Sequence, residues 1–428
     1  MGTAFRPTPL YWRVLAILAA LGSAALLLCL CVLPTTHWFD LHDVRIYHDQ
    51  SRWVVGEGTL YRDVPSEYPL LANLLFGKCR LGAALLSPLI AEPTAYAWLW
   101  LTAAWFVFLA VGHLIATRVR PRAVWAWLAP GALFFALFRY DIYPAATTLL
   151  ALLALRDDKM LRGACWLGVT VALKGYALFL VPAFLVFMLQ TAGGLQALRA
   201  GIVAAAPFTC ANLAVLLVAG WDGMLFPFRF HAQRFNFGES SYDAFYYLGA
   251  FLFEEHPTVG GRLPFLLQAG CAILAAAMRP RTFDELIDSF LVALLGFMSF
   301  SVFYSPQYIL WILPIACFSS SILLHRIAVA YGWLTFLYFP IFHVAGSKSV
   351  TLALSVAHGG VVRVVLFRAC VILVTFCRFA MIAVAVRDWW TGRRQSAEPY
   401  RVEFSRCQEV PGDFRMSTER REHHPTCP

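Results

Sequence analysis

Runs of about 20 apolar residues recur along this 428-residue sequence, and they constrain its fold more than any other feature. Hydrophobic residues make up 60% of the chain and charged residues only 14%, whereas an ordinary soluble domain carries about 25% charged residues. A soluble core cannot bury that much apolar surface. Because a helix satisfies its own backbone hydrogen bonds inside a lipid bilayer, the sequence predicts an all-α integral membrane protein.

The apolar runs predict about twelve transmembrane helices. The first run, Tyr11–Leu33, follows the basic Arg6 and Arg13 and is longer than the apolar core of a signal peptide, so we expect a retained anchor. The later candidates are Ala95–Thr117, Ala123–Phe138, Ile142–Leu155, Leu161–Gln190 as two short spans that meet near Lys174, Leu198–Gly220, Arg262–Met278, Glu285–Phe303, Tyr308–Leu324, Ile327–Phe342 and Val361–Val386.

The run Pro69–Ile90 is left out of this count, because Lys78 and Arg80 interrupt its middle. A charge at mid-depth in a bilayer is costly, so we expect a re-entrant or surface-lying segment there. Basic clusters such as Arg118–Arg122 then all fall on the cytoplasmic side, as the positive-inside rule requires. The prediction is a multi-pass protein of the plasma membrane with both termini in the cytoplasm.

The same count places the unusual polar residues together on the outer side of the membrane. They come from the loop 35–87, from 139–141, Lys174, the loop 221–245 and 304–307. Polar residues at span ends that face one cavity indicate a functional site. We therefore expect residues 1–386 to form one membrane domain and residues 387–428 a polar, disordered cytoplasmic tail. The net charge of +9 lies in short arginine clusters between spans, so it does not indicate a nucleic-acid partner.

The loop 35–87 is the largest polar block of the membrane domain. It combines carboxylates with aromatic residues, namely Asp40, Asp43, Asp49, Glu57, Asp63 and Glu67 with Trp38, Tyr47, Trp53, Tyr61 and Tyr68. Long loops of this composition are more often functional than idle. His37, His42 and His48 lie nearby, but their spacing matches no helical ligand pair, so a divalent metal is possible and not favoured.

Several short motifs together resemble one known family. They are Asp43-Val-Arg-Ile-Tyr47, Gly58-x-x-Tyr61-x-Asp63, Glu67-Tyr-Pro69, Arg139-Tyr-Asp141, Lys174-Gly-Tyr176, His231-x-x-Arg234 followed by Glu239-Ser240, and Ser305-Pro-Gln-Tyr308 with Trp311 and Pro314. In order and spacing they resemble the bacterial GT-C mannosyltransferases that use polyprenyl phosphates, glycosyltransferase family 87. The resemblance covers Asp43 to Pro314 and departs from the family pattern at Leu70 and Ala177, where that family tends to have proline.

The resemblance implies a GT-C fold and an inverting hexosyltransferase with a polyprenyl-phosphate hexose, mannose in that family, as its donor. A lipid-linked donor fits an outer face that has no supply of nucleotide sugars, and the sequence contains no Asp-x-Asp and no glycine-rich phosphate loop before a helix. The acceptor would be a lipid or glycan. No cofactor is expected, and membrane lipids are the other expected partners.

Transfer from a lipid phosphate needs a base for the acceptor hydroxyl and cations for the departing phosphate. Asp43 suits the first role, since the resemblance places the catalytic aspartate there, and Asp40 is its local competitor. Lys174, His231, Arg234 and Arg139 are the candidates for binding the donor phosphate. The candidates for substrate binding are Asp40, Tyr47, Tyr61, Glu67, Tyr68, Glu239, Ser240 and Gln307.

Structural alternatives exist for each of these residues. A loop aspartate such as Asp43 can cap a helix, Lys174 can extend from a span end to the interface, and Arg139 can pair with Asp141 across a tight turn. A transporter or flippase of lipid-linked sugars is the alternative function, although transporters tend to show internal repeats and charges at the midplane. The acceptor, the linkage and the oligomeric state stay open.

Overall fold

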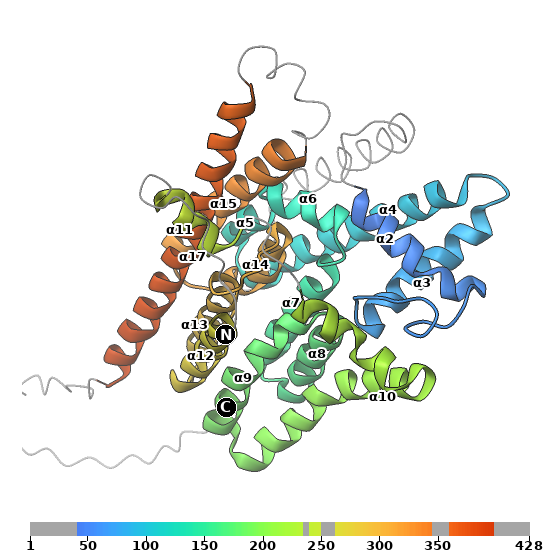
Figure 1. Ribbon diagram of the computed structural model, residues 1–428. Coiled ribbons are helices and arrows are strands. Elements are labelled where there is room, and N and C mark those ends of the chain that lie inside the picture. Colours follow the sequence, from blue (N-terminus) through green and yellow to red (C-terminus); the bar gives the residue numbers. More distant parts are fainter. Residues whose placement is uncertain (1–40, 234–238, 250–261, 345–358, 398–428) are drawn as a thin grey trace, which may run out of the picture.

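The computed structural model describes residues 41–233, 239–249, 262–344 and 359–397. Within these ranges the chain is helical, and its only β feature is an isolated bridge between Leu60 and Val64 (Figure 1). The predicted all-α fold is thus confirmed for the described part of the chain.

Five described helices are long and apolar enough to cross a membrane, and a bent helix pair makes a sixth if it counts as one span. The five are Glu92–Val119, Gly175–Ala192, Gly194–Ala232, Ile322–Phe339 and Val364–Arg393, and the bent pair is Pro121–Trp127 with Pro130–Phe138. These helices fit a membrane-embedded protein. The count of twelve spans stays a prediction, and the expected first span, Tyr11–Leu33, lies outside the described residues.

The N-terminal part forms a lobe of four elements. These are α2 (His42–Gln50), the 3-10 turn η1 (Arg52–Val55), α3 (Leu70–Leu86) and α4 (Glu92–Leu114). Pro69 is extended before α3 and Pro93 occupies the first turn of α4, the helix position that best tolerates proline. The short connection between them lets α3 pack along α4, while α2 and η1 pack against α3.

The middle of the chain is broken at two places, of which the first, inside the expected span Ala123–Phe138, was not predicted. The pair α5 (Val124–Trp127) and α6 (Pro130–Phe138) is bent by 62°, because Pro130 cannot continue the preceding helix. After α7 (Ile142–Arg156), helix α8 (Met160–Leu173) stops at Lys174, whose backbone is extended, and the chain resumes as η4 (Gly175–Leu180) and α9 (Val181–Ala192). The predicted break near Lys174 is confirmed.

Helix α10 corrects one prediction. It runs from Gly194 to Ala232 and changes direction at Gly220, whose φ of 70° belongs to the left-handed region that glycine adopts readily. Residues 221–232 were expected in an outer loop and are helical instead, so His231 projects from a helix. The next helix, α11, spans Ser241–Gly249.

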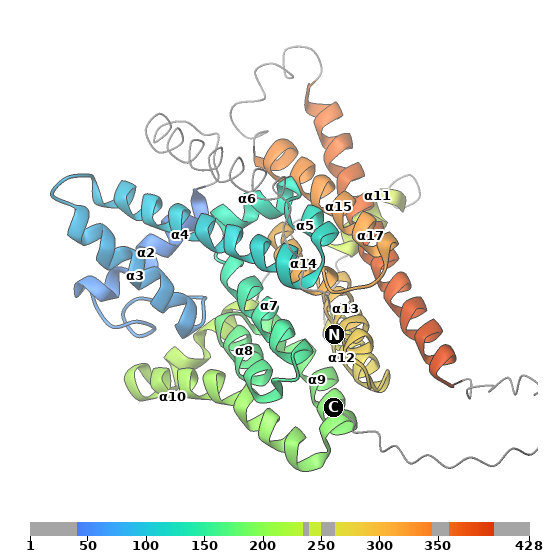
Figure 2. The same ribbon diagram turned by 180° about the vertical axis from the view of Figure 1, so that it is seen from behind.

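The C-terminal part contains α12 (Leu263–Ala277), α13 (Phe283–Ser299), η5 (Pro306–Tyr308), α14 (Ile309–Ala316), α15 (Ile322–Phe336), the π-helix η6 (Leu337–Val344) and α17 (Gly359–Ala397). Long α17 packs against α13 and α15, as Figure 2 shows from behind.

Two predicted boundaries in this part are wrong. Tyr308–Leu324 is not one span, because α14 ends at Ala316 and Ser321 caps a new helix by accepting a hydrogen bond from the Leu324 backbone N–H. Helix α17 also continues past residue 386 to Ala397. Residues 387–397 of the expected disordered tail are therefore helical, and residues 398–428 lie outside the described part.

Close contact between α6 and α15 depends on glycine. A Cβ added at Gly131 would lie 2.5 Å from the backbone oxygen of Gly332, and backbone cannot move aside as a flexible side chain can. We expect Gly131→Ala to lower the stability of the protein by about 1–3 kcal/mol through overpacking. Thermal unfolding in detergent would measure the loss.

Gly270→Ala in α12 is the matched control, because nothing lies within 4 Å of its added Cβ. It should leave the unfolding temperature unchanged or raise it slightly, since alanine favours a helix. Equal effects of the two substitutions would contradict the close α6–α15 packing.

Candidate functional site

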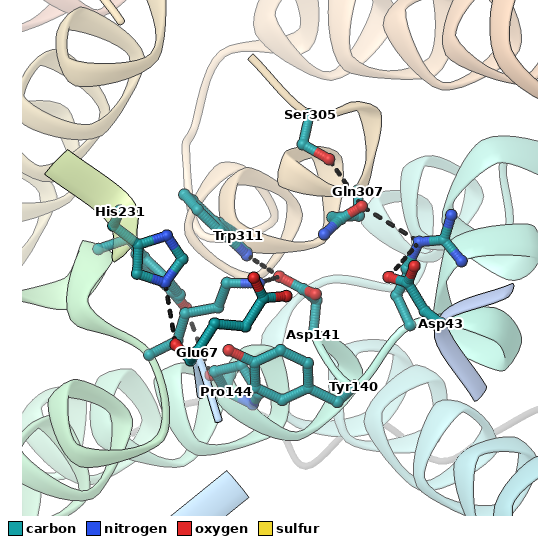
Figure 3. A network of polar contacts seen from close by, with 12 residues as sticks. Asp43, Glu67, Tyr140, Asp141, Pro144, His231, Ser305, Gln307 and Trp311 are labelled. Carbon is teal, nitrogen blue, oxygen red and sulfur yellow. Dashed lines mark hydrogen bonds and ion pairs between the residues drawn. The ribbon is translucent and has the colours of Figure 1, made fainter. Parts of the chain in front are cut away.

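An ion pair joins the first described helix to the middle of the chain. Asp43 lies in the first turn of α2, and its Oδ2 is 3.0 Å from Nε of Arg139. Arg139 follows α6 in an extended conformation and is buried. Its Nε also donates to Oε1 of Gln307 at 3.2 Å, and Ser305 Oγ donates to the same oxygen at 2.7 Å (Figure 3). Residues from three distant segments thus meet around Asp43.

Tyr47 packs inside the protein and holds the Asp43 side chain of this pair in place. It is fully buried, stacks on Phe76 with 4.3 Å between ring centroids, and its hydroxyl donates to Asp43 Oδ2 at 3.4 Å. The Tyr140 backbone N–H donates to the same hydroxyl at 3.3 Å. Burial raises the pKa of Tyr47 well above its ordinary value, so the hydroxyl keeps its proton. No surface of the Tyr47 ring is accessible in this structure, and its role in substrate binding stays a prediction.

Tyr68 and Tyr61 also differ in their roles. Tyr68 is buried edge-on against Tyr47, with 5.4 Å between ring centroids, and it acts in packing. The Tyr61 hydroxyl donates to the Tyr68 carbonyl oxygen at 2.5 Å, and Tyr61 also lines a cavity. Of these two tyrosines, Tyr61 is the one that can still meet a ligand.

A second buried ion pair lies beside the first. Nζ of Lys174 is 2.6 Å from Oδ1 of Asp141, and the Trp311 indole N–H donates to that oxygen at 2.5 Å. The same ammonium lies 4.4 Å from the Tyr140 ring centroid and 5.2 Å from that of Trp311, within the range of cation–π attraction. Asp141 is fully buried, and its Oδ2 accepts no hydrogen bond from any described residue.

This arrangement contradicts the structural alternative for Arg139 and shows how the charge of Lys174 is balanced. Arg139 and Asp141 do not pair with each other across their turn, because each has a distant partner, Asp43 and Lys174 respectively. The charge of Lys174 is also compensated inside the protein, so repulsion among cations does not by itself demand an external anion at this site.

A cavity of about 210 Å³ adjoins the second pair. Its polar lining includes Lys174, Glu67 and His231, and His231 Nε2 donates to the Glu67 backbone oxygen at 3.1 Å. Most of the other lining residues are apolar and come from both arms of the kinked α10; they include Phe208, Val215, Met224, Pro227 and Phe228. The structure thus brings four predicted site residues, Tyr61, Glu67, Lys174 and His231, to one cavity with a polar end and apolar walls.

Glu239 and Ser240 lie at the start of α11. The Ser240 hydroxyl and backbone N–H both donate to Asp243 Oδ2, at 2.5 and 2.8 Å, and the hydroxyl accepts from the Asp243 backbone N–H at 3.2 Å, so Ser240 caps α11. Its role in substrate binding stays a prediction. Burial raises the pKa of Glu239 to about 8, the charge of Asp243 adds to this shift, and the positive charge of Arg139 opposes it. Glu239 is therefore close enough to Arg139 to sense its charge.

The remaining predictions divide as follows. Arg234 and Asp40 lie outside the described residues. Among the described residues no group of three or more His, Cys, Asp and Glu side chains could hold a metal ion. Asp141 and Trp311 belong to this site, although the sequence analysis gave neither of them a role in it. Both residues are part of the quoted motifs. The position of Asp141, two residues after the candidate Arg139, was the signal that could have pointed to it.

Comparison with known proteins assigns neither a family nor a function to this chain. No protein-family model matches the sequence, and a search of curated proteins finds no match.

The Lys174–Asp141 pair can be tested by its energetic coupling. Asp141→Asn should destabilise the protein by about 3–5 kcal/mol, because it leaves the Lys174 ammonium buried without its counter-ion. In a Lys174→Met background the same substitution should cost much less, since no charge is then left unpaired. Unfolding of the four proteins in detergent gives the coupling free energy, and additive effects would contradict a direct pair.

Glu239 should make stability depend on pH. The folded protein keeps its proton up to about pH 8, whereas the unfolded chain releases it near the ordinary pKa of 4.5. The unfolded state therefore binds fewer protons in this window, and the free energy of unfolding should fall as the pH rises through it. Glu239→Gln cannot titrate, so the difference between wild type and variant isolates this residue. Parallel stability curves for the two proteins would contradict the raised pKa.

Proposed function

We propose that this protein is a membrane glycosyltransferase that transfers a hexose, mannose by the family resemblance, from a polyprenyl phosphate to a lipid or glycan acceptor on the outer face. The observation that carries the proposal is the meeting of Asp43, Arg139 and Gln307 with the Lys174–Asp141 pair, next to a cavity with apolar walls. These residues come from motifs that lie far apart in the sequence and that together resemble the family.

The cavity suits an amphiphilic donor. An isoprenoid chain would pack against the apolar side chains of α10, and the phosphate would lie at the end that carries Lys174 and His231. Hydrogen bonds between a charged donor and a phosphate are stronger than neutral ones. Glu67, which lines the same cavity, would accept hydrogen bonds from sugar hydroxyls.

Asp43 would act as the general base. The acceptor oxygen attacks the anomeric carbon, its proton passes to the Asp43 carboxylate, and the bond from that carbon to the phosphate oxygen breaks. Polyprenyl phosphate leaves with the electron pair, and the anomeric configuration inverts because there is one displacement. The Asp43 side chain is partly exposed, unlike the fully buried Asp141, so it is the carboxylate that an acceptor can reach.

The ion pair with Arg139 would control when Asp43 can accept a proton. A carboxylate paired with a guanidinium at 3.0 Å is held in its charged form and is a weak proton acceptor. A phosphate that enters the site would compete with Asp43 for Arg139, since guanidinium groups bind phosphates through two parallel hydrogen bonds. Donor binding would thereby release the base.

We expect Asp43→Asn to lower turnover by about 10²–10⁴-fold, because the amide keeps the size of the side chain and loses its basicity. The assay uses the purified protein with radiolabelled polyprenyl-phosphate hexoses and follows label that leaves the donor. Asp49→Asn is the matched control, since Asp49 is exposed on the same helix, and its turnover should stay within about twofold of the wild type.

Two results would count against the proposal. Near-normal turnover of Asp43→Asn would move the base to another residue. A wild-type protein that moves lipid-linked sugar across vesicle membranes and releases no polyprenyl phosphate would favour a transporter instead.

A further inference from the structure

Helix α17 places an arginine in the middle of a candidate membrane span. Arg378 lies near the centre of Val364–Arg393, and no part of it is exposed. Among the described residues no carboxylate forms an ion pair with it. A charge buried at this depth is costly, and ionisable residues inside spans therefore mark functional sites. Since α17 packs against α11 and α15 (Figure 1), the contacts of Arg378 with its neighbours indicate what it does.

These contacts reach two segments beside the candidate site. Nη2 of Arg378 donates to Ser241 Oγ at the start of α11, at 2.9 Å, and to Thr375 Oγ1 on α17 itself, at 2.7 Å. Its guanidinium carbon lies 4.0 Å from the centroid of the Tyr304 ring, within the range of cation–π attraction. Nε and Nη1 have no hydrogen-bond partner in the described part of the chain. Nη2 and the face of the guanidinium thus join α17 to α11 and to Tyr304.

Tyr304 leads directly into the segment that contacts Arg139. It is buried, and its hydroxyl shares a hydrogen bond with the Tyr331 hydroxyl of α15. Three residues further along, Gln307 accepts from Arg139 Nε at 3.2 Å, and that Nε is 3.0 Å from Asp43 Oδ2. The place of the Tyr304 ring therefore fixes where this segment presents Gln307 to Arg139.

A second series of contacts leads from Tyr304 to the other ion pair. Tyr304 packs edge-on against Tyr308 with 5.5 Å between ring centroids, and Tyr308 stacks on Trp311 at 3.8 Å. The Trp311 indole N–H in turn donates to Asp141 Oδ1. Arg378 is thus connected with both ion pairs of the site through one short segment, although it touches neither of them.

The cavity described above lies apart from these contacts. Its lining residues come from the segments 61–70, 171–175 and 208–231 and from Tyr140. Among the described residues, α11, the segment 304–308 and α17 contribute no lining residue. A change at Arg378 can therefore reach Arg139 without altering the walls of the cavity.

We propose that Arg378 is a positioning residue, which holds the segment 304–308 and the start of α11 so that Gln307 keeps Arg139 in place beside Asp43. This role rests on the proposed function, in which Arg139 passes from Asp43 to the donor phosphate. Without Arg378, Gln307 would lose its fixed place and Arg139 would be misplaced for that exchange. Small displacements of groups around the reacting atoms are costly in rate. Turnover should therefore fall, while donor binding in the cavity is kept.

The first test separates turnover from donor binding. Arg378→Met removes the charge and both hydrogen bonds, and an apolar replacement of a buried charge is often tolerated in folding. We expect kcat to fall by about 10–100-fold, with the KM for radiolabelled polyprenyl-phosphate hexose within about twofold of the wild type. Loss of donor affinity with kcat unchanged would overturn the positioning role.

Arg368→Met is the matched control. Arg368 lies on the same helix and its guanidinium carbon is 5.0 Å from the ring centroid of Tyr247 on α11, but its side chain is exposed. Both kinetic constants should stay within about twofold of the wild type. Equal kinetics of Arg378→Met and Arg368→Met would contradict the proposal.

A double-mutant cycle tests the route through Gln307. If Arg378 acts through this residue, Arg378→Met should lower kcat little further in a Gln307→Ala background. Two losses that multiply would overturn the proposal, because Arg378 would then act by another route. Arg378→Lys keeps the charge and takes the place of Arg378→Met in the cycle where methionine yields no folded protein.

Hydrogen exchange tests the same contacts without any substrate. The backbone amides of 304–308 should exchange faster in Arg378→Met than in Arg368→Met, while those of α7 should exchange alike in both. Equal exchange at 304–308 would overturn the proposal even if the wild type transfers hexose. Absence of transfer by the wild type would instead count against the proposed function, so the two failures are distinguishable.

Discussion

A single buried carboxylate oxygen holds the centre of this molecule together. Oδ1 of Asp141 receives both the Lys174 ammonium and the Trp311 indole N–H, so it joins the start of α7, the break after α8 and helix α14. A buried charge is costly unless it is paired and hydrogen-bonded. The non-helical backbone at Lys174 therefore has a clear reason, because a helical continuation would carry this side chain elsewhere.

The three-residue turn before α7 extends the same constraint toward the surface. Arg139 reaches Asp43 on α2, the Tyr140 backbone N–H reaches the Tyr47 hydroxyl, and Asp141 turns inward. Successive residues of one short segment thus fix three parts of the chain relative to each other. This explains how a loop near the N-terminus comes to share a site with residues from the second half of the sequence.

Features that depend on neighbouring residues could be predicted from the sequence, whereas contacts between residues far apart in the chain could not. Apolar run length is local, so the helices and the break at Lys174 were predicted, whereas Ala123–Phe138 was expected as one span and is bent by 62° at Pro130. Partners are not local: Arg139 and Asp141 are two residues apart with opposite charges, and the sequence could not show that each pairs with a distant residue. Residues 221–232 were assigned to a loop because the expected span ended at Gly220, yet they continue α10 beyond its kink.

The charge balance of the site has a consequence for the proposed reaction. Asp43 with Arg139 and Asp141 with Lys174 are each nearly neutral together, so these residues offer little attraction to a free anion at long range. A ligand phosphate that reached Arg139 would gain only the difference between that contact and the one that Asp43 gives up, and Lys174 already has Asp141 as its counter-ion. Apolar contacts with the cavity walls would have to supply the rest, which favours a phosphate attached to a hydrocarbon chain over a soluble one. Under the proposed function, the same exchange would tie the basicity of Asp43 to the presence of the donor, so that a proton would be drawn from the acceptor only when a donor is bound.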